Sequence, residues 1–271
     1  MKPGRHAGKT MTMHRIDYDR VAQLYDEPER DHVVDSNLLA FLASSAESRS
    51  TFRILDIGCG TGKQLAVNRQ RFPHILMVGL DRFAGMLRIA RRRCPDVLWV
   101  QGDGASLPLS SVAFDYITSQ FAYPHVRNTG QLLRELCRTL KPGGRFVMTN
   151  IDPWSMPEWI IYRYFPEAFA LDQQDFVPVD QFVSLMHEAG FQDVRVARDE
   201  LTRQESVGTF LEFATTRHRA SQLMAISDEA YTAGLRRVRA ALAEGRDQEV
   251  FVRSEFVLVT IVGHKALRET A

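Results

Sequence analysis

The stretch FRILDIGCGTG at residues 52–62 decides the fold. Its first six residues are mostly apolar and are typical of a short buried strand, which runs into a turn that holds Gly58, Gly60 and Gly62. Glycine has no Cβ, so a turn of this kind lets a ligand approach the backbone closely. The helix expected after the turn would present free N–H groups and a partial positive charge to that ligand. The stretch therefore predicts a strand, a ligand-binding turn and a helix, in that order.

Strand and helix signals alternate downstream of this turn. Strands are expected at 74–80, 97–100, 114–118 and 145–149. An apolar stripe between the last two predicts a helix over 132–140, which ends at the Lys-Pro-Gly-Gly of 141–144 because proline cannot continue a helix. This alternation indicates a parallel sheet with right-handed crossovers.

The two ends of the chain follow a different pattern. Upstream, residues 19–44 are expected to be helical with a break at Pro28. Downstream, a helix is expected at 182–189, an edge strand at 194–196 and a buried strand at 256–262, with helices from Ser206 to Gly245. We expect a flexible tail over residues 1–14 and one domain over 15–271, with a helical insertion at about 200–248 between the last two strands.

The bulk composition excludes several classes of partner. Lys and Arg number 34 against 33 Asp and Glu, and this net charge of +1 gives no electrostatic reason to expect binding to nucleic acid or to a membrane surface. The basic run Arg91-Arg92-Arg93 is interpreted as the solvated face of a helix. Three scattered cysteines without a C-x-x-C pair predict neither disulfides nor structural zinc, and they fit a reducing compartment. We expect a cytoplasmic monomer or homodimer that binds neither nucleic acid nor membrane.

Two further aspartates follow the next two strands. Asp81 ends the second strand, where a carboxylate can accept hydrogen bonds from both hydroxyls of a ribose. Asp103, just past the third strand, can accept from an adenine amino group. Either aspartate alone is a common turn residue. Together with Asp56 they place carboxylates at the ends of three successive strands, which indicates a nucleoside site.

The turn does not match the dinucleotide or P-loop fingerprints. A G-x-G-x-x-G motif requires glycine at position 63, where the chain has Lys63, and no G-K-[ST] follows. The pattern therefore favours a nucleoside ligand without a pyrophosphate. It weighs against a nicotinamide-dependent oxidoreductase on a related fold, which we keep as the first alternative.

Several segments in order resemble the motifs of class I S-adenosylmethionine-dependent methyltransferases. The resemblance is closest to the small-molecule branch that includes the ubiquinone and menaquinone biosynthesis methyltransferases, and it runs from about Tyr18 to Ile151. The segments are Tyr18–Asp26, which is similar to that branch's N-terminal helix, Ile54–Gly62, Gly79–Asp81, Gly102–Asp103 with Leu107-Pro108, and Leu140–Gly144.

The resemblance implies a Rossmann-like, doubly wound α/β fold. Its mostly parallel seven-stranded sheet would have an antiparallel last strand, and the helical insertion would act as a lid. The implied cofactor is S-adenosylmethionine, with S-adenosylhomocysteine as product, and the implied reaction is in-line transfer of the methyl group to a small molecule.

The resemblance also assigns cofactor contacts to individual residues. The implied contacts are Asp56, Gly58, Cys59 and Gly60 with the methionine portion; Asp81 with the ribose; Arg82, Met86, Asp103 and Gly104 with the adenine; Gln120 and Phe121 beside the methyl group; and Tyr18 and Tyr25 above the pocket.

Methyl transfer requires a general base only if the nucleophile must lose a proton. His125 lies nearest the expected methyl position, and Tyr123 and Asp152 are further candidates, with His218 a weaker one. The alternative is that His125 holds the loop or the cofactor carboxylate and takes no proton. No spacing of histidines and carboxylates predicts a catalytic metal.

An aromatic segment follows the fifth strand. Trp154, Trp159 and Tyr162, with Phe210 from the insertion, are predicted to form an apolar wall for an aromatic or aliphatic acceptor. The alternative is that these rings pack the insertion onto the sheet. A non-catalytic cofactor-binding protein and an RNA or protein methyltransferase also stay open, and the sequence identifies neither the acceptor nor the methylated atom.

Overall fold

A computed structural model describes residues 16–26, 32–45, 52–245 and 248–267. The expected tail at 1–14 and the helix break at Pro28 lie outside these ranges. The described chain forms one seven-stranded sheet in the order β3-β2-β1-β4-β5-β7-β6, in which β1 to β5 are parallel and β7 runs antiparallel to both neighbours. The expected Rossmann-like α/β sheet with an antiparallel last strand is confirmed. The strands are β1 Arg53–Ile57, β2 Leu76–Asp81, β3 Leu98–Gln101, β4 Phe114–Gln120, β5 Leu140–Ile151, β6 Phe191–Ser206 and β7 Phe251–Lys265.

Helices cover both faces of the sheet. Leu55 and Ile57 of β1 belong to one hydrophobic cluster, whereas Ile54 and the preceding Phe52 belong to the other, because side chains alternate along a strand. The first face is covered by α5 Thr129–Thr139 and α8 Val179–Glu188, and the second by α2 Ser36–Ser45, α3 Lys63–Arg71 and α4 Ala84–Arg93.

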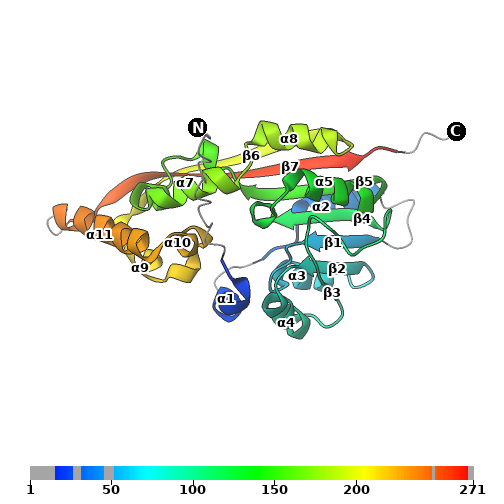
Figure 1. Cartoon of the computed structure of the whole chain (residues 1–271), viewed down its shortest axis with the longest axis horizontal. Helices are drawn as coiled ribbons and strands as arrows, with labels where there is room; N and C mark the ends of the chain where they lie inside the picture. Colours follow the sequence, from blue (N-terminus) through cyan, green and yellow to red (C-terminus); the bar gives the residue numbers. More distant parts are fainter. Residues whose placement is uncertain (1–15, 27–31, 46–51, 246–247, 268–271) are drawn as a thin grey trace, which may run out of the picture.

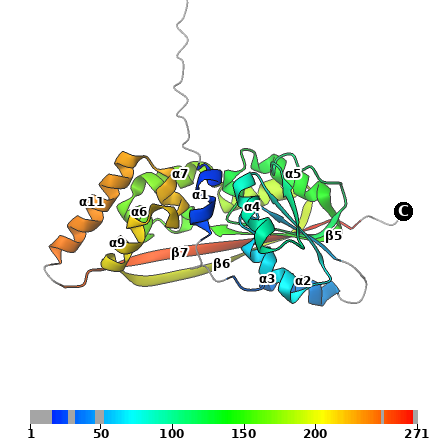
Figure 2. The ribbon, with the colours of Figure 1, turned by 90° about the horizontal axis from the view of Figure 1, so that it is seen from below.

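The last two strands are much longer than the sequence predicts. β7 pairs with β5 as far as Leu258 and then continues, paired with β6 on its outer side, to Phe251. This extension carries the helices α9 Val207–Thr215 and α11 Asp228–Glu244 away from the parallel strands (Figure 2), with α10 Ser221–Ala225 between them in the chain. Residues 200–206 belong to β6, so the helices begin at Val207. Residues 192–204 of β6 are almost all exposed, and they lack the apolar alternation that would have revealed a long strand.

The aromatic segment after β5 folds into short helices that fill the angle between the sheet and this extension (Figure 1). Ile160 donates its backbone N–H to Ser254 Oγ of β7 at 3.1 Å. Phe165 is fully buried and contacts Phe210 and Tyr231 of the insertion. Among the described residues, no helix is both long enough and apolar enough to cross a lipid bilayer. The short elements here are η2 Pro153–Ser155, α6 Ile160–Tyr164 and α7 Pro166–Asp175, with η1 Tyr123–His125 after β4, η3 Arg217–Arg219 in the insertion and α1 Tyr18–Tyr25 at the start of the described chain.

Candidate active site

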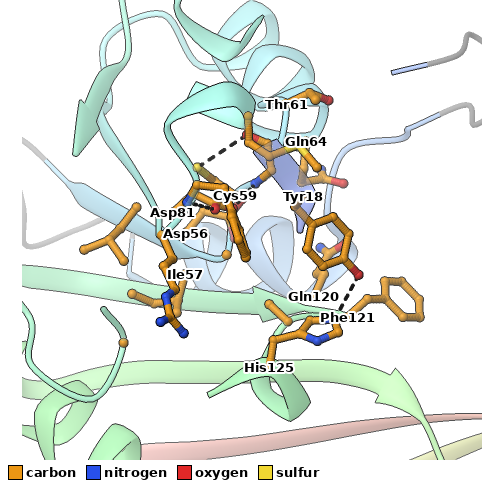
Figure 3. Close-up of a pocket in the computed structure, with 18 of the residues that line it drawn as sticks. Tyr18, Asp56, Ile57, Cys59, Thr61, Gln64, Asp81, Gln120, Phe121 and His125 are labelled. Atoms are coloured by element: carbon orange, nitrogen blue, oxygen red, sulfur yellow. Dashed lines mark hydrogen bonds between the residues drawn. The ribbon is translucent and has the colours of Figure 1, made fainter. Parts of the chain in front are cut away.

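A cavity of about 230 Å³ opens at the carboxyl ends of β1, β2 and β4 (Figure 3). Its floor is the turn after β1, and its roof is α1. The carboxyl end of an open parallel sheet is where such folds bind ligands. The cavity therefore lies where the sequence predicts the site.

All thirteen residues assigned to the cofactor line this cavity, and so does His125. Sequence reasoning missed several others. Lys63 and Gln64 begin α3 directly after the glycine turn, so their position could have signalled them, whereas His32 comes from the segment before α2 and has no such signal. The predicted lining residues are Tyr18, Tyr25, Asp56, Gly58, Cys59, Gly60, Asp81, Arg82, Met86, Asp103, Gly104, Gln120 and Phe121.

The glycine turn has the geometry of a cradle. Gly58, Gly60 and Gly62 have φ values of 71°, 53° and 76°, a left-handed conformation that glycine adopts without strain. A Cβ on Gly60 would meet no atom within 4 Å, so the backbone there faces open space. A Cβ on Gly58 would lie 2.2 Å from the Cβ of Ala122. The backbone N–H of Gly58 donates to Leu80 O at 2.8 Å, which ties the turn to β2.

Asp81 joins the turn to the next strand. Its Oδ2 accepts from the backbone N–H of Gly60 and its Oδ1 from that of Phe83, both at 2.9 Å. Burial raises the pKa of Asp81, and these hydrogen bonds oppose the rise. An ionised carboxylate has about four lone-pair sites, so acceptor capacity stays available for a ribose hydroxyl.

Asp56 is buried in the cavity wall. Burial, followed by the negative charges of Asp35 and Asp81, raises its pKa to about 8. Asp35 is itself held by the hydroxyl of Tyr116 at 2.8 Å. A wall with several carboxylates favours a positively charged ligand, such as one that carries an ammonium or a sulfonium group.

Asp103 stabilises its own turn and also lines the cavity. Its Oδ1 accepts from the backbone N–H of Ala105 at 2.9 Å, and Ser106 donates to its carbonyl at 3.0 Å. The plain interpretation as a turn residue is thus correct, and the residue also lines the cavity.

The roof brings two chemical groups together. Tyr18 of α1 lies 5.7 Å from the ring of Tyr25, centroid to centroid. The Tyr18 hydroxyl hydrogen-bonds to His125 Nε2 at 3.2 Å, across the cavity from α1 to the loop after β4 (Figure 3). His125 is therefore positioned at the cavity by a residue 107 positions away in the sequence.

The other catalytic candidates lie outside the cavity lining. Tyr123 is buried and donates to Val177 O at 3.5 Å, and burial raises the pKa of its hydroxyl. Asp152 is also buried, and its Oδ2 accepts from Ser155 at 2.7 Å. Tyr123 packs against Phe176 and Phe182, and Asp152 also forms an ion pair with Arg198 of β6. His218 lies on η3 of the insertion.

The predicted aromatic wall is separated from the cavity as well. Trp154 is 44% exposed, and Trp159 packs against Tyr162 and Phe256. The Tyr162 hydroxyl donates to the buried Asp172 at 2.6 Å. Phe210 stacks on Tyr164. Trp159 therefore packs on the sheet and Phe210 joins the insertion to α6, and none of the four lines the cavity. Their part in acceptor binding stays a prediction.

The residues present fit S-adenosylmethionine. The open backbone at Gly60 suits a closely approaching ligand, Asp81 keeps acceptor sites for a ribose, and Asp56 offers a carboxylate to a cation. No group of three or more metal-ligating side chains occurs within the described parts of the chain.

Comparison with known proteins gives the same result. Residues 55–148 match the family model described as a methyltransferase domain. A demethylmenaquinone methyltransferase of Thermotoga maritima is 27% identical over 68% of this chain and 90% of its own length. A 2-phytyl-1,4-naphtoquinone methyltransferase of Thermosynechococcus vestitus is 30% identical over 52% of this chain and 72% of its own length. For a demethylmenaquinone methyltransferase of Streptomyces griseus, at 34% identity, the match spans about half of either chain.

Solved structures share the fold. Phosphoethanolamine N-methyltransferase 2 of Haemonchus contortus, solved with S-adenosyl-L-methionine, superposes with a TM-score of 0.57 at 21% identity, over 92% of this chain and 56% of that one. A protein of an antibiotic biosynthesis pathway of Anabaena variabilis gives 0.60 at 20% identity, over 82% and 96%. The nicotinamide-dependent alternative is set aside by the family match. The chain belongs to the class I S-adenosylmethionine-dependent methyltransferases.

Proposed function

We propose that this methyltransferase acts on a small apolar or aromatic molecule and that His125, together with Tyr18, accepts the proton that the nucleophile loses. The hydrogen bond between the Tyr18 hydroxyl and His125 Nε2 carries the proposal. It places two groups that can exchange a proton at the cavity, on elements that approach it from opposite sides.

The other cavity residues would bind and orient the cofactor. When bound, S-adenosylmethionine supplies a methyl group on a sulfonium centre that is already a good leaving group. Asp56 would hold the amino group of its methionine portion and Asp81 its ribose, while α1 excludes water from above. Such positioning contributes roughly 7–11 kcal/mol to catalysis in favourable cases.

Phe121 supports an apolar acceptor. It has a φ of 53°, a left-handed conformation that costs energy for a bulky residue, and strained residues of this kind are concentrated at functional sites. The residue is 49% exposed and lines the cavity beside Gln120. A half-exposed ring offers contact area to a flat apolar molecule. The name of the Thermosynechococcus relative includes a naphthoquinone, a molecule of this class.

The test is a transfer assay with isotope-labelled S-adenosylmethionine and a panel of phenols, quinols, aromatic amines and aliphatic acceptors. We expect label in at least one aromatic product. With that acceptor, His125→Ala should lower kcat by about 10²–10⁴-fold, the usual contribution of a general base, and shift the pH profile. Kd for S-adenosylhomocysteine is measured alongside, which separates lost cofactor binding from lost proton transfer.

Tyr123→Phe is the matched control, because this residue lies two positions from His125 but outside the cavity lining. It should leave kcat and its pH dependence unchanged. Unaltered turnover in His125→Ala would refute the proton-accepting role. The alternative, in which His125 holds the loop or the cofactor carboxylate, would then stand. Labelling confined to protein or RNA added to the assay would refute the small-molecule acceptor.

A further inference from the structure

The basic run at the end of α4 is not uniformly solvated. Arg92 is exposed, as the sequence predicts for the whole run. Arg93 instead is three-quarters buried and uses its guanidinium on two different segments. One nitrogen donates to Asp26 at 2.6 Å, at the end of α1, and another donates to the backbone carbonyl of Thr61 in the glycine turn.

A second contact joins the same two helices at their other ends. Asp19 in the first turn of α1 accepts through Oδ1 from the backbone N–H of Gly85, at the start of α4. A Cβ on Gly85 would lie 2.9 Å from that oxygen and 3.0 Å from the carbonyl oxygen of Asp19. The close approach of α1 thus depends on glycine here.

These contacts matter because α1 cannot rely on its own stability. It has eight residues, and helices shorter than about 12–15 residues are marginal in water by themselves. Its Tyr18 and Tyr25 line the cavity only while it is docked on α4. The glycine turn provides the opposite wall. Arg93 contacts both walls, although it does not line the cavity itself.

We infer that Arg93 is a positioning residue of the cofactor site, which holds the roof helix and the glycine turn in one geometry through a single guanidinium. Guanidinium is suited to this task because its planar fork presents several donors in fixed directions, whereas an ammonium offers a point charge. A single partly exposed ion pair adds little to folding stability, so the effect should appear in ligand affinity.

The test compares Arg93→Ala with Arg92→Ala, its exposed neighbour in the same helical turn. Binding of S-adenosylhomocysteine is measured by calorimetry, and unfolding of the ligand-free protein is followed separately. We expect Arg93→Ala to weaken binding by about tenfold, because the short helix α1 would then be undocked in most ligand-free molecules and would have to dock again when the ligand binds. The melting temperature without ligand should match that of Arg92→Ala. Arg93→Lys keeps the charge but not the fork, and should lose most of the same affinity.

Asp26→Ala closes a double-mutant cycle with Arg93→Ala. If the guanidinium acts as a bridge, the Asp26 change weakens binding in the native background and has little further effect once Arg93 is gone. Hydrogen exchange gives a second readout: S-adenosylhomocysteine should slow exchange in α1 of the wild type and not of Arg93→Ala.

The inference would be overturned if Arg93→Ala or Arg93→Lys bound S-adenosylhomocysteine with native affinity. It would also be overturned if the losses of affinity in the double-mutant cycle were additive. A fall in ligand-free stability that accounts for the whole loss of affinity would overturn it too. None of these measurements involves the methyl acceptor, so the result does not depend on the proton-accepting role of His125.

Discussion

The carboxyl group of Asp56 shows how one residue can oppose folding and favour binding. Burial and two neighbouring carboxylates raise its pKa to about 8, so the folded protein binds a proton that the unfolded chain, with a pKa near 3.8, has released. The ionised form is therefore disfavoured in the fold, and this residue lowers the free energy of unfolding progressively as pH rises from about 4 to about 8. A bound ammonium group reverses the preference, because it stabilises the carboxylate.

This reversal predicts a pH-dependent affinity. S-adenosylhomocysteine should bind more tightly as pH rises toward 8 and then level off, with release of a proton on binding at lower pH. Calorimetry in buffers of different ionisation enthalpy measures that proton directly. Asp56→Asn should weaken binding and reduce the proton release, and should raise the ligand-free melting temperature at pH 8.5. If Asp56→Asn released as many protons on ligand binding as the wild type, the released proton would come from another group.

At the scale of the element, the packing of α11 depends on glycine at position 234, which has no side chain. A Cβ on Gly234 would lie 2.1 Å from the ring of Phe165, which is fully buried and cannot move aside. Alanine is the better helix former by about 0.8–1.0 kcal/mol, so propensity alone favours Gly234→Ala. Overpacking a core costs about 1–3 kcal/mol, so we expect net destabilisation in urea unfolding.

Gly208→Ala provides the comparison within the same insertion. The nearest atom to its Cβ would be Ser206 Oγ at 3.6 Å, an ordinary contact. This variant should be neutral or slightly stabilised. If both glycine variants gain stability, the contact between α11 and Phe165 is looser than the structure has it.

At the scale of the whole molecule, one hydrophobic cluster joins the sheet to the insertion. The cluster that contains Leu55 and Ile117 of the sheet also contains Phe210, Leu223 and Val238 of the insertion. We therefore expect one cooperative unfolding transition, with tryptophan fluorescence and far-ultraviolet circular dichroism coincident. Saturating S-adenosylhomocysteine should move both signals together, by about 2.7 kcal/mol at a hundredfold excess over Kd. A separate, ligand-insensitive transition would show that the insertion unfolds independently.

Features that local sequence determines could be predicted, whereas features that depend on tertiary contacts could not. The glycine turn and the strand-end aspartates were predictable because local geometry dictates them, and the cofactor contacts followed from the resemblance. The aromatic segment was harder to interpret, because rings such as Trp159 and Tyr162 are equally suited to a substrate wall and to a core. Arg93 could not be told from Arg92, since only the tertiary contact with α1 distinguishes them.

The outer strand β6 leaves one long edge of the sheet without a neighbour among the described residues. An unpaired edge is a template on which another extended chain can add itself, and this one is sixteen residues long. Its exposed stretch carries both cations and anions, including Arg198, Asp199, Glu200 and Arg203. Any strand that docked there would have to strip water from these charges, so the edge resists the first step of fibrous aggregation.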